Sequence, residues 1–213
     1  MKPFIGISYN WTPSATRQSV WERTVAAARK CYPGAKIILH HDKDAAREAL
    51  ALADVLVQWD TETAASRLFW RMTCVGDPDL DAVLLRDTDA PPNQREADAV
   101  VAWLKSDFKL HTMFDQPSKS LVRVPGGLWG SKRGAFPYDF SRLVRWWIWQ
   151  KKPAGPGAER QFLDRYVYPY AVRGGLNHRC SGRNGFTDNF HINARPFPGG
   201  ATPETGHVGG RTS

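Results

Sequence analysis

The chain has 213 residues, 42% of them hydrophobic and 12% aromatic, so it is long enough to bury the core of one large domain. No stretch approaches the roughly 18 apolar residues of a membrane-spanning helix, and the first apolar run, at residues 4–7, is too short for a signal peptide. Cys31, Cys74 and Cys180 are odd in number and far apart. They exclude a disulfide framework and a cysteine metal motif, and they predict a reducing cytoplasm.

The positive charge is concentrated in one segment. The whole chain carries +8, but residues 117–183 hold 13 Lys and Arg against 3 Asp and Glu, a net of +10. Residues 1–116 hold 14 against 16, and residues 184–213 balance at 2 against 2. Such a block predicts a polyanionic partner or a phosphate-rich ligand. The alternative is a solvated basic face without a partner.

The first 90 residues alternate short apolar strands with helices. The expected strands are residues 4–8, 36–39, 54–58 and 82–85, and the expected helices are residues 20–30, 44–52 and a longer one from 61 or 63 to 75. This order predicts an α/β fold, with a mostly parallel, Rossmann-like sheet flanked by helices in a single domain. A glycine-rich phosphate loop is absent, so a nucleotide would be held through a metal and scattered side chains.

The expected strand at residues 82–85 leads into Arg86 and two carboxylates, Asp87 and Asp89. In an extended segment side chains alternate, so the two carboxylates would point the same way. They would lie at the carboxyl end of a buried strand, where open α/β sheets bind ligands. Carboxylate oxygens suit a hard cation such as Mg²⁺ or Mn²⁺. A polar turn with helix-capping aspartates is the alternative.

The second half continues with further strands and helices. Asn93 is the expected cap of the next helix, and a strand at residues 109–114 leads to Asp115. A glycine pair at residues 126–127 stands at a strand entrance, where a ligand can approach the backbone. Helices are expected at residues 140–150 and 159–168.

We expect one domain over residues 1–194 and a flexible tail over residues 195–213. Residues 1–90 would form the nucleotide-binding half of the domain, and residues 91–194 the acceptor half.

Five blocks occur in a fixed order: LLRDTDA, QREADAVVAWLKS, LHTMFDQP, VPGGLWGSKRG and RQFLDRYVYP. In this order, over roughly residues 67–170, the chain resembles glycosyltransferases of the GT-A type, in particular a compact bacterial and phage group. It departs from that group at Ala90, where Ser is usual, and at Phe114, where Arg is usual. Glu159 and Gln161 stand in place of an Asp-Gln pair, which alters the acceptor side.

The resemblance implies metal-dependent transfer of a sugar from a nucleoside diphosphate sugar, with a UDP-sugar as first candidate, to an acceptor hydroxyl. Asp89 would contact Mn²⁺ or Mg²⁺ directly, and Asp87 would bind the donor's ribose or sugar, directly or through the metal. His178 or His191 would supply a further metal ligand, unless both are plain loop histidines. The other implied donor-binding residues are Arg71, Arg86, Gly126, Gly127 and Trp129. The alternatives are a surface ion pair for each arginine and a core position for Trp129.

In an inverting enzyme a carboxylate must deprotonate the acceptor hydroxyl. Asp115 is the first candidate for this base, and an Asx turn before Pro117 is its alternative interpretation. Glu159 is the second candidate; if configuration is retained it would instead stabilise the reacting carbon.

Basic side chains alternate with tryptophans in the +10 segment, a pattern that fits a phosphate backbone and stacked bases. The candidate acceptor-binding residues are Arg142, Arg145, Trp146, Lys151 and Lys152. The favoured acceptor is phage double-stranded DNA bearing hydroxymethylated pyrimidines, and a cell-envelope glycan or lipid-linked acceptor is the alternative. Two rival classes are a non-catalytic nucleic-acid-binding module and a metal-dependent nuclease, for which residues 117–183 offer few carboxylates.

Overall fold

A computed structural model describes residues 4–11, 18–60, 64–115, 122–155, 157–179 and 193–198. Its strands are β1 (Ile5–Asn10), β2 (Lys36–His41), β3 (Val55–Gln58), β4 (Ala82–Arg86), β5 (Leu110–Phe114), β6 (Leu128–Lys132), β7 (Gly175–Arg179) and β8 (Ala194–Pro196). They form one eight-stranded sheet in the order β3-β2-β1-β4-β6-β5-β7-β8. Only β6 runs antiparallel to its neighbours, so the sheet is mostly parallel, as predicted.

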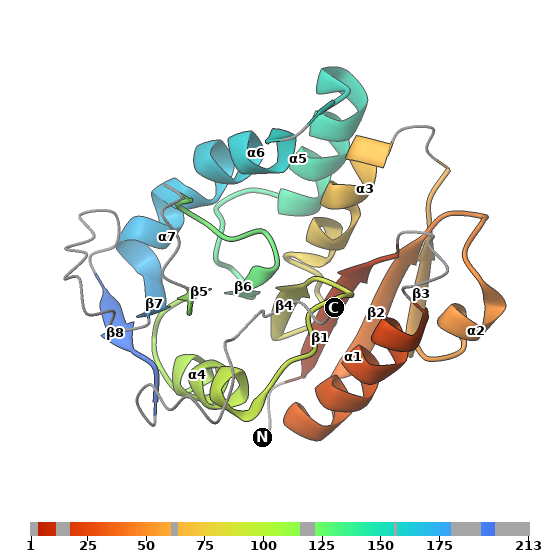
Figure 1. Cartoon of the computed structure of the whole chain (residues 1–213). Helices are drawn as coiled ribbons and strands as arrows, with labels where there is room; N and C mark the ends of the chain where they lie inside the picture. Colours follow the sequence, from red (N-terminus) through yellow and green to blue (C-terminus); the bar gives the residue numbers. More distant parts are fainter. Residues whose placement is uncertain are drawn as a thin grey trace.

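Helices cover both faces of the sheet (Figure 1). They are α1 (Gln18–Cys31), α2 (Arg47–Leu50), α3 (Ala64–Trp70), α4 (Gln94–Leu104), α5 (Phe140–Trp146), α6 (Ala158–Tyr166) and α7 (Tyr168–Gly174). A 3₁₀ turn, η2 (Arg71–Cys74), continues α3, and a π-helical turn, η3 (Trp147–Lys151), continues α5. In Figure 1, α1 and α4 lie on one side of the sheet, and α3, α5, α6 and α7 lie on the other. In the part of the chain that is described, no helix is long and apolar enough to cross a membrane.

Each face of the sheet has its own hydrophobic core, because successive strand side chains point to opposite faces. Leu84 packs in the core that contains Trp103 of α4, which we call the α4 face. Leu85 packs in the core that contains Phe162 of α6, which we call the α6 face. Burying these large side chains on both faces provides the main stabilisation of the fold. The same alternation decides on which face the polar residues after β4 lie.

The structure differs from the sequence-based expectation in the second half. The strands β7 and β8 were not predicted, because their short, polar sequences lack a clear alternation. The predicted tail boundary at residue 195 falls inside β8, which pairs with β7, and Phe197 is 3% exposed. The remaining tail, residues 199–213, lies outside the described residues.

Candidate active site

A turn at the carboxyl end of β4 carries the two predicted metal ligands. The backbone N–H of Ala90 donates a hydrogen bond of 3.3 Å to the carbonyl of Asp87, so the chain turns at once. The hydroxyl of Thr24 in α1 donates to the carbonyl of Thr88 at 2.9 Å and fixes the turn against the sheet. The side chain of Asp87 is 37% exposed, and Asp89 is half-buried. The segment after Arg86 is therefore a turn and not the extended segment that was expected, so the alternation of a strand does not apply to Asp87 and Asp89.

Arg71, the first residue of η2, joins two carboxylates from distant parts of the chain. Its guanidinium is buried and donates to Oδ1 of Asp87 and, at 2.8 Å, to Oε1 of Glu159. It also donates to the carbonyl of Arg86 at 2.8 Å. Burial lowers the pKa of Arg71, but the two carboxylates outweigh burial and raise that pKa above its ordinary value. The Arg71 side chain therefore remains a fixed cation between two anions.

The glycine pair lies beside Asp87 because of the strand register. The N–H of Leu128 donates to the carbonyl of Pro125 at 3.2 Å, so residues 126–127 are the centre of a β-turn that opens β6. Since β6 is antiparallel to β4, with Leu128 opposite Arg86, the turn meets the carboxyl end of β4. The sequence-based prediction of glycines at a strand entrance is confirmed.

Carboxylate groups occupy the space that a side chain would need at Gly126 and Gly127. A Cβ atom on Gly126 would lie 2.5 and 2.6 Å from the two carboxylate oxygens of Glu159. A Cβ atom on Gly127 would lie 2.5 Å from Cγ of Asp87. Any side chain at either position would therefore displace a carboxylate, and the glycine backbone forms one wall of the site.

Glu159 projects from the first turn of α6, and its side chain is 19% exposed. Burial raises the pKa of Glu159, Arg71 opposes this shift, and the charge of Asp87 adds to it. The resulting pKa of Glu159 lies above the ordinary value for a glutamate. A carboxylate with a raised pKa is a stronger base and is therefore better suited to accept a proton from a hydroxyl. Arg71, Asp87, Glu159 and the glycine turn form what we call the carboxylate cluster, on the α6 face.

Two predicted donor-binding residues belong to the core instead. Arg86 is 1% exposed on the α4 face, where its Nε donates to Glu96 at 2.6 Å. The hydroxyl of Tyr32 donates to the same carboxylate at 2.6 Å, which completes a buried polar network. Trp129 is fully buried against Phe140, with ring centroids 6.2 Å apart. This burial and these partners do not support donor contacts by the side chains of Arg86 and Trp129, and for Trp129 they fit the alternative of a core position.

The predicted base and the predicted histidine ligand also lie on the α4 face. Asp115 is 2% exposed and pairs with Arg95 of α4 at 2.8 Å. His178 is equally buried, and its Nδ1 lies 2.8 Å from Nε2 of His111. Burial lowers the pKa of His178 to about 4, so its ring is neutral at physiological pH. These positions do not support Asp115 as the base or His178 as a metal ligand, and His191 lies outside the described residues.

The predicted acceptor-binding residues lie together on α5 and η3. We call the set the basic-aromatic surface, and its exposed members are Arg142, Arg145, Trp146, Trp149, Lys151 and Lys152. Trp146 is 42% exposed and Trp149 73% exposed, which is unusual for such large apolar side chains. The Lys151 ammonium lies 5.8 Å from the Trp146 ring, so cations and aromatic rings are interleaved. The buried face of α5 packs against η2, which carries Arg71.

No protein-family model matches this sequence, and neither does any curated protein. Solved structures do match. A glycosyltransferase involved in glycosylation of the major capsid of PBCV-1 is 13% identical, with a TM-score of 0.53, over 83% of this chain and 82% of that one. Glucosyl-3-phosphoglycerate synthase from Mycobacterium tuberculosis, in complex with Mn²⁺, UDP and phosphoglyceric acid, is 14% identical over 83% of this chain and 68% of that one, with the same TM-score.

A further structure of the mycobacterial synthase, with Mg²⁺ and UDP, is 12% identical over 83% of this chain and 69% of that one, with a TM-score of 0.53. At these identities the similarity is one of fold. The chain has the GT-A type α/β fold, as the sequence resemblance predicted.

Proposed function

We propose that the chain is a metal-dependent glycosyltransferase, which moves a sugar from a nucleoside diphosphate sugar to an acceptor hydroxyl. One observation carries the proposal: Arg71 joins Asp87 and Glu159 beside the Gly126–Gly127 turn, at the carboxyl end of β4. That edge is where open α/β sheets bind ligands. The solved structures that share the fold include a glycosyltransferase and a synthase that binds UDP.

The side chains of the β4 turn fit a divalent cation. Asp87 and Asp89 offer carboxylate oxygens, the donors that Mg²⁺ and Mn²⁺ prefer. Within the described residues no group of three metal-binding side chains occurs. This matches a cation held by one or two carboxylates and completed by substrate phosphates and water, rather than by a closed protein site. When bound, the cation neutralises the negative charge that develops on the departing diphosphate.

The residues of the carboxylate cluster would orient the donor and handle the acceptor proton. Arg71 holds the carboxylates of Asp87 and Glu159 in fixed positions, so neither must reorganise when substrate binds. The absence of side chains at Gly126 and Gly127 leaves room for the carboxylates of Glu159 and Asp87 beside the turn. Glu159, with its raised pKa, is the group we assign to accept the proton of the acceptor hydroxyl. In a retaining reaction the same carboxylate would stabilise the positive charge on the reacting carbon.

The donor is proposed to be a UDP-sugar, on the support of the UDP complexes of the mycobacterial synthase. We also propose that residues 1–194 act as one catalytic unit, with the donor half and the acceptor half meeting at Asp87 and Glu159.

For the acceptor we infer a polyanion that binds the basic-aromatic surface. Trp149 is 73% exposed, and the same surface carries four exposed cationic side chains, a combination that suits phosphates and stacked bases. Double-stranded DNA with hydroxymethylated pyrimidines is the acceptor we propose first, and an anionic envelope glycan or lipid-linked acceptor is second. The basic-aromatic surface alone supports this acceptor.

The activity is tested by incubating the protein with Mn²⁺ and a panel of nucleotide sugars, with hydroxymethylated DNA and an envelope glycan as acceptors. Mass spectrometry of nucleosides and glycans would detect a mass increase of one sugar. Glu159→Gln should abolish transfer while UDP binding persists, and the exposed α2 residue Glu48→Gln serves as the charge-matched control. Full activity of Glu159→Gln, or no transfer and no UDP binding by the wild-type chain, would overturn the proposal.

The acceptor is tested by titrating duplex DNA at about 50 and 200 mM salt. Binding through several phosphate contacts should weaken by orders of magnitude between these concentrations. Trp149→Ala should lower the affinity roughly tenfold without lowering the melting temperature, because the side chain is exposed. Salt-insensitive binding, or equal binding by Trp149→Ala, would exclude DNA recognition by this surface.

A further inference from the structure

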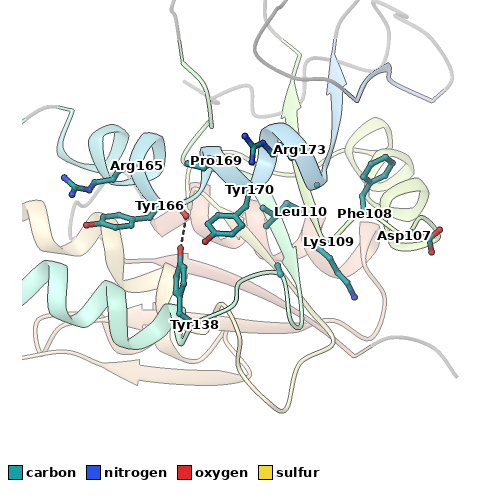
Figure 2. Close-up of a pocket in the computed structure, with 12 residues that line it drawn as sticks. Asp107, Phe108, Lys109, Leu110, Tyr138, Arg165, Tyr166, Pro169, Tyr170 and Arg173 are labelled. Atoms are coloured by element: carbon teal, nitrogen blue, oxygen red, sulfur yellow. Dashed lines mark hydrogen bonds between the residues drawn. The ribbon is translucent and has the colours of Figure 1, made fainter.

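A cavity of about 850 Å³ is lined by residues of α6 and α7 and by the segment before β5 (Figure 2). Lys109 and Gly174 stand immediately before β5 and β7, and both line the cavity. These strands are parallel to each other, so the cavity opens at their amino ends. Its volume is within the range of small-molecule pockets, about 300–1,000 Å³. The carboxylate cluster lies at the carboxyl end of β4, so the two sites are separate.

Aromatic rings form one wall of this cavity. The rings of Tyr138 and Tyr170 meet edge to face, with centroids 6.0 Å apart. The hydroxyl of Tyr138 donates to the carbonyl of Tyr166 at 3.1 Å, which fixes the ring across the gap between α5 and α6 (Figure 2). Phe136 packs against Tyr170 from behind, at 5.2 Å. The rings are thus held rigidly, with apolar faces and polar edges available to a ligand.

Cationic side chains surround the aromatic wall. Lys109, Arg165 and Arg173 line the cavity, and Asp107 is its one acidic lining residue. Among the described residues neither Lys109 nor Arg173 forms an ion pair with a carboxylate, and both are exposed. The guanidinium of Arg165 lies 5.5 Å from the Tyr166 ring at the rim of the cavity, where its planar fork suits an anion. An anionic group would therefore find unpaired donors beside a flat apolar wall.

We propose that this cavity is a second ligand site, which binds a small phosphorylated compound with a ring. The phosphoryl group would be held by Arg173, because a guanidinium offers paired donors to phosphate oxygens. Arg165 and Lys109 extend in other directions in Figure 2 and would attract the anion from the rim of the cavity. The ring would lie on Tyr138 and Tyr170. A nucleotide base and a sugar both present a face that packs on an aromatic ring, so a nucleoside monophosphate and a sugar phosphate share the required chemistry. The proposal does not depend on the activity proposed above.

The test is calorimetric titration of the full chain with UMP, glucose 6-phosphate and inorganic phosphate. EDTA is present throughout, so that metal-dependent binding at the carboxylate cluster is suppressed. Arg173→Gln removes a phosphate donor from an exposed position without touching the core. Tyr170→Leu removes the ring. Arg47→Gln, an exposed arginine of α2, is the matched control.

We expect saturable binding of UMP or glucose 6-phosphate, with an affinity at least tenfold above that of inorganic phosphate. Arg173→Gln and Tyr170→Leu should each weaken binding about tenfold, a loss that corresponds to one charge-assisted contact or one ring contact, and Arg47→Gln should leave it unchanged. Preference for UMP would identify a nucleotide site, and preference for glucose 6-phosphate a sugar phosphate site. The proposal fails if neither ring compound binds better than phosphate, or if Arg173→Gln binds as tightly as Arg47→Gln.

Discussion

Replacing Arg71 by methionine tests how much this cation stabilises the carboxylate cluster and the fold. Methionine keeps most of the side-chain volume but removes the hydrogen bonds to Asp87, Glu159 and the carbonyl of Arg86. Removing one partner of a buried ion pair costs about 3–5 kcal/mol. Because the side chains of Asp87 and Glu159 are 37% and 19% exposed, water replaces part of this interaction. We therefore expect a loss of about 2–4 kcal/mol in the free energy of unfolding at pH 7.5.

The stability that Arg71→Met loses relative to the wild type at pH 7.5 should be partly recovered at pH 5. Without Arg71, burial and the charge of Asp87 both raise the pKa of Glu159, and no cation opposes them. A carboxyl group whose folded-state pKa is raised stabilises the fold at low pH, and that contribution is lost as pH rises through the folded-state pKa. The difference between the variant and the wild type should therefore be smaller at pH 5 than at pH 7.5.

Urea denaturation followed by circular dichroism measures both effects. The control is Arg29→Met, which removes an exposed pair with Asp54, whose side chains are 48% and 36% exposed. That pair should contribute no more than about 1 kcal/mol. The reasoning is refuted if Arg71→Met is as stable as Arg29→Met, or if its loss of stability is the same at both pH values.

Three further predictions concern single residues. Gly126→Ala should reduce transfer at least tenfold, measured as UDP release, because its Cβ would displace the carboxylate of Glu159; normal turnover would contradict this. Glu96→Gln should lower the free energy of unfolding by about 3–5 kcal/mol in urea, because it leaves the buried Arg86 cation uncompensated; a loss below about 1 kcal/mol would count against it. Protonation of buried His178 should destabilise the fold as pH falls from about 6.5 to about 4, since its folded-state pKa is depressed. His178→Gln should therefore flatten the dependence of melting temperature on pH over that range. An unchanged slope would show that protonation of His178 does not cause the loss of stability in acid.

The sequence contained enough local information to predict the sheet around β4 and the helix after it. Asn93 was predicted as a helix cap, and its side chain accepts a hydrogen bond from the N–H of Glu96 at 3.0 Å. The Glu96 side chain also accepts hydrogen bonds from Arg86 and Tyr32, partners that a local capping motif does not predict. The local motif therefore predicted the start of the helix correctly. The partners of the Glu96 side chain were not predictable from it, because they lie on other elements of the fold.

The division of residues between the two faces was partly predictable. Arg86 and Asp87 are adjacent, so the alternation of a strand should have placed them on opposite faces of the sheet, and they could not share one ligand. Arg71 was predicted as a donor contact, but no local pattern indicates its pairing with Glu159, which lies 88 residues away. Such pairing depends on how α6 packs, which periodicity cannot reveal. The cavity at Tyr138 and Tyr170 was missed for the same reason.

The donor-site assignment is tested most directly by calorimetric titration of the chain with UDP, with and without Mn²⁺. The account predicts binding by the wild type that requires Mn²⁺, and loss of that binding in Asp89→Asn, whereas Glu48→Gln binds normally. Equal UDP binding by Asp89→Asn and the wild type, or binding that ignores Mn²⁺, would contradict a donor site at the carboxyl end of β4.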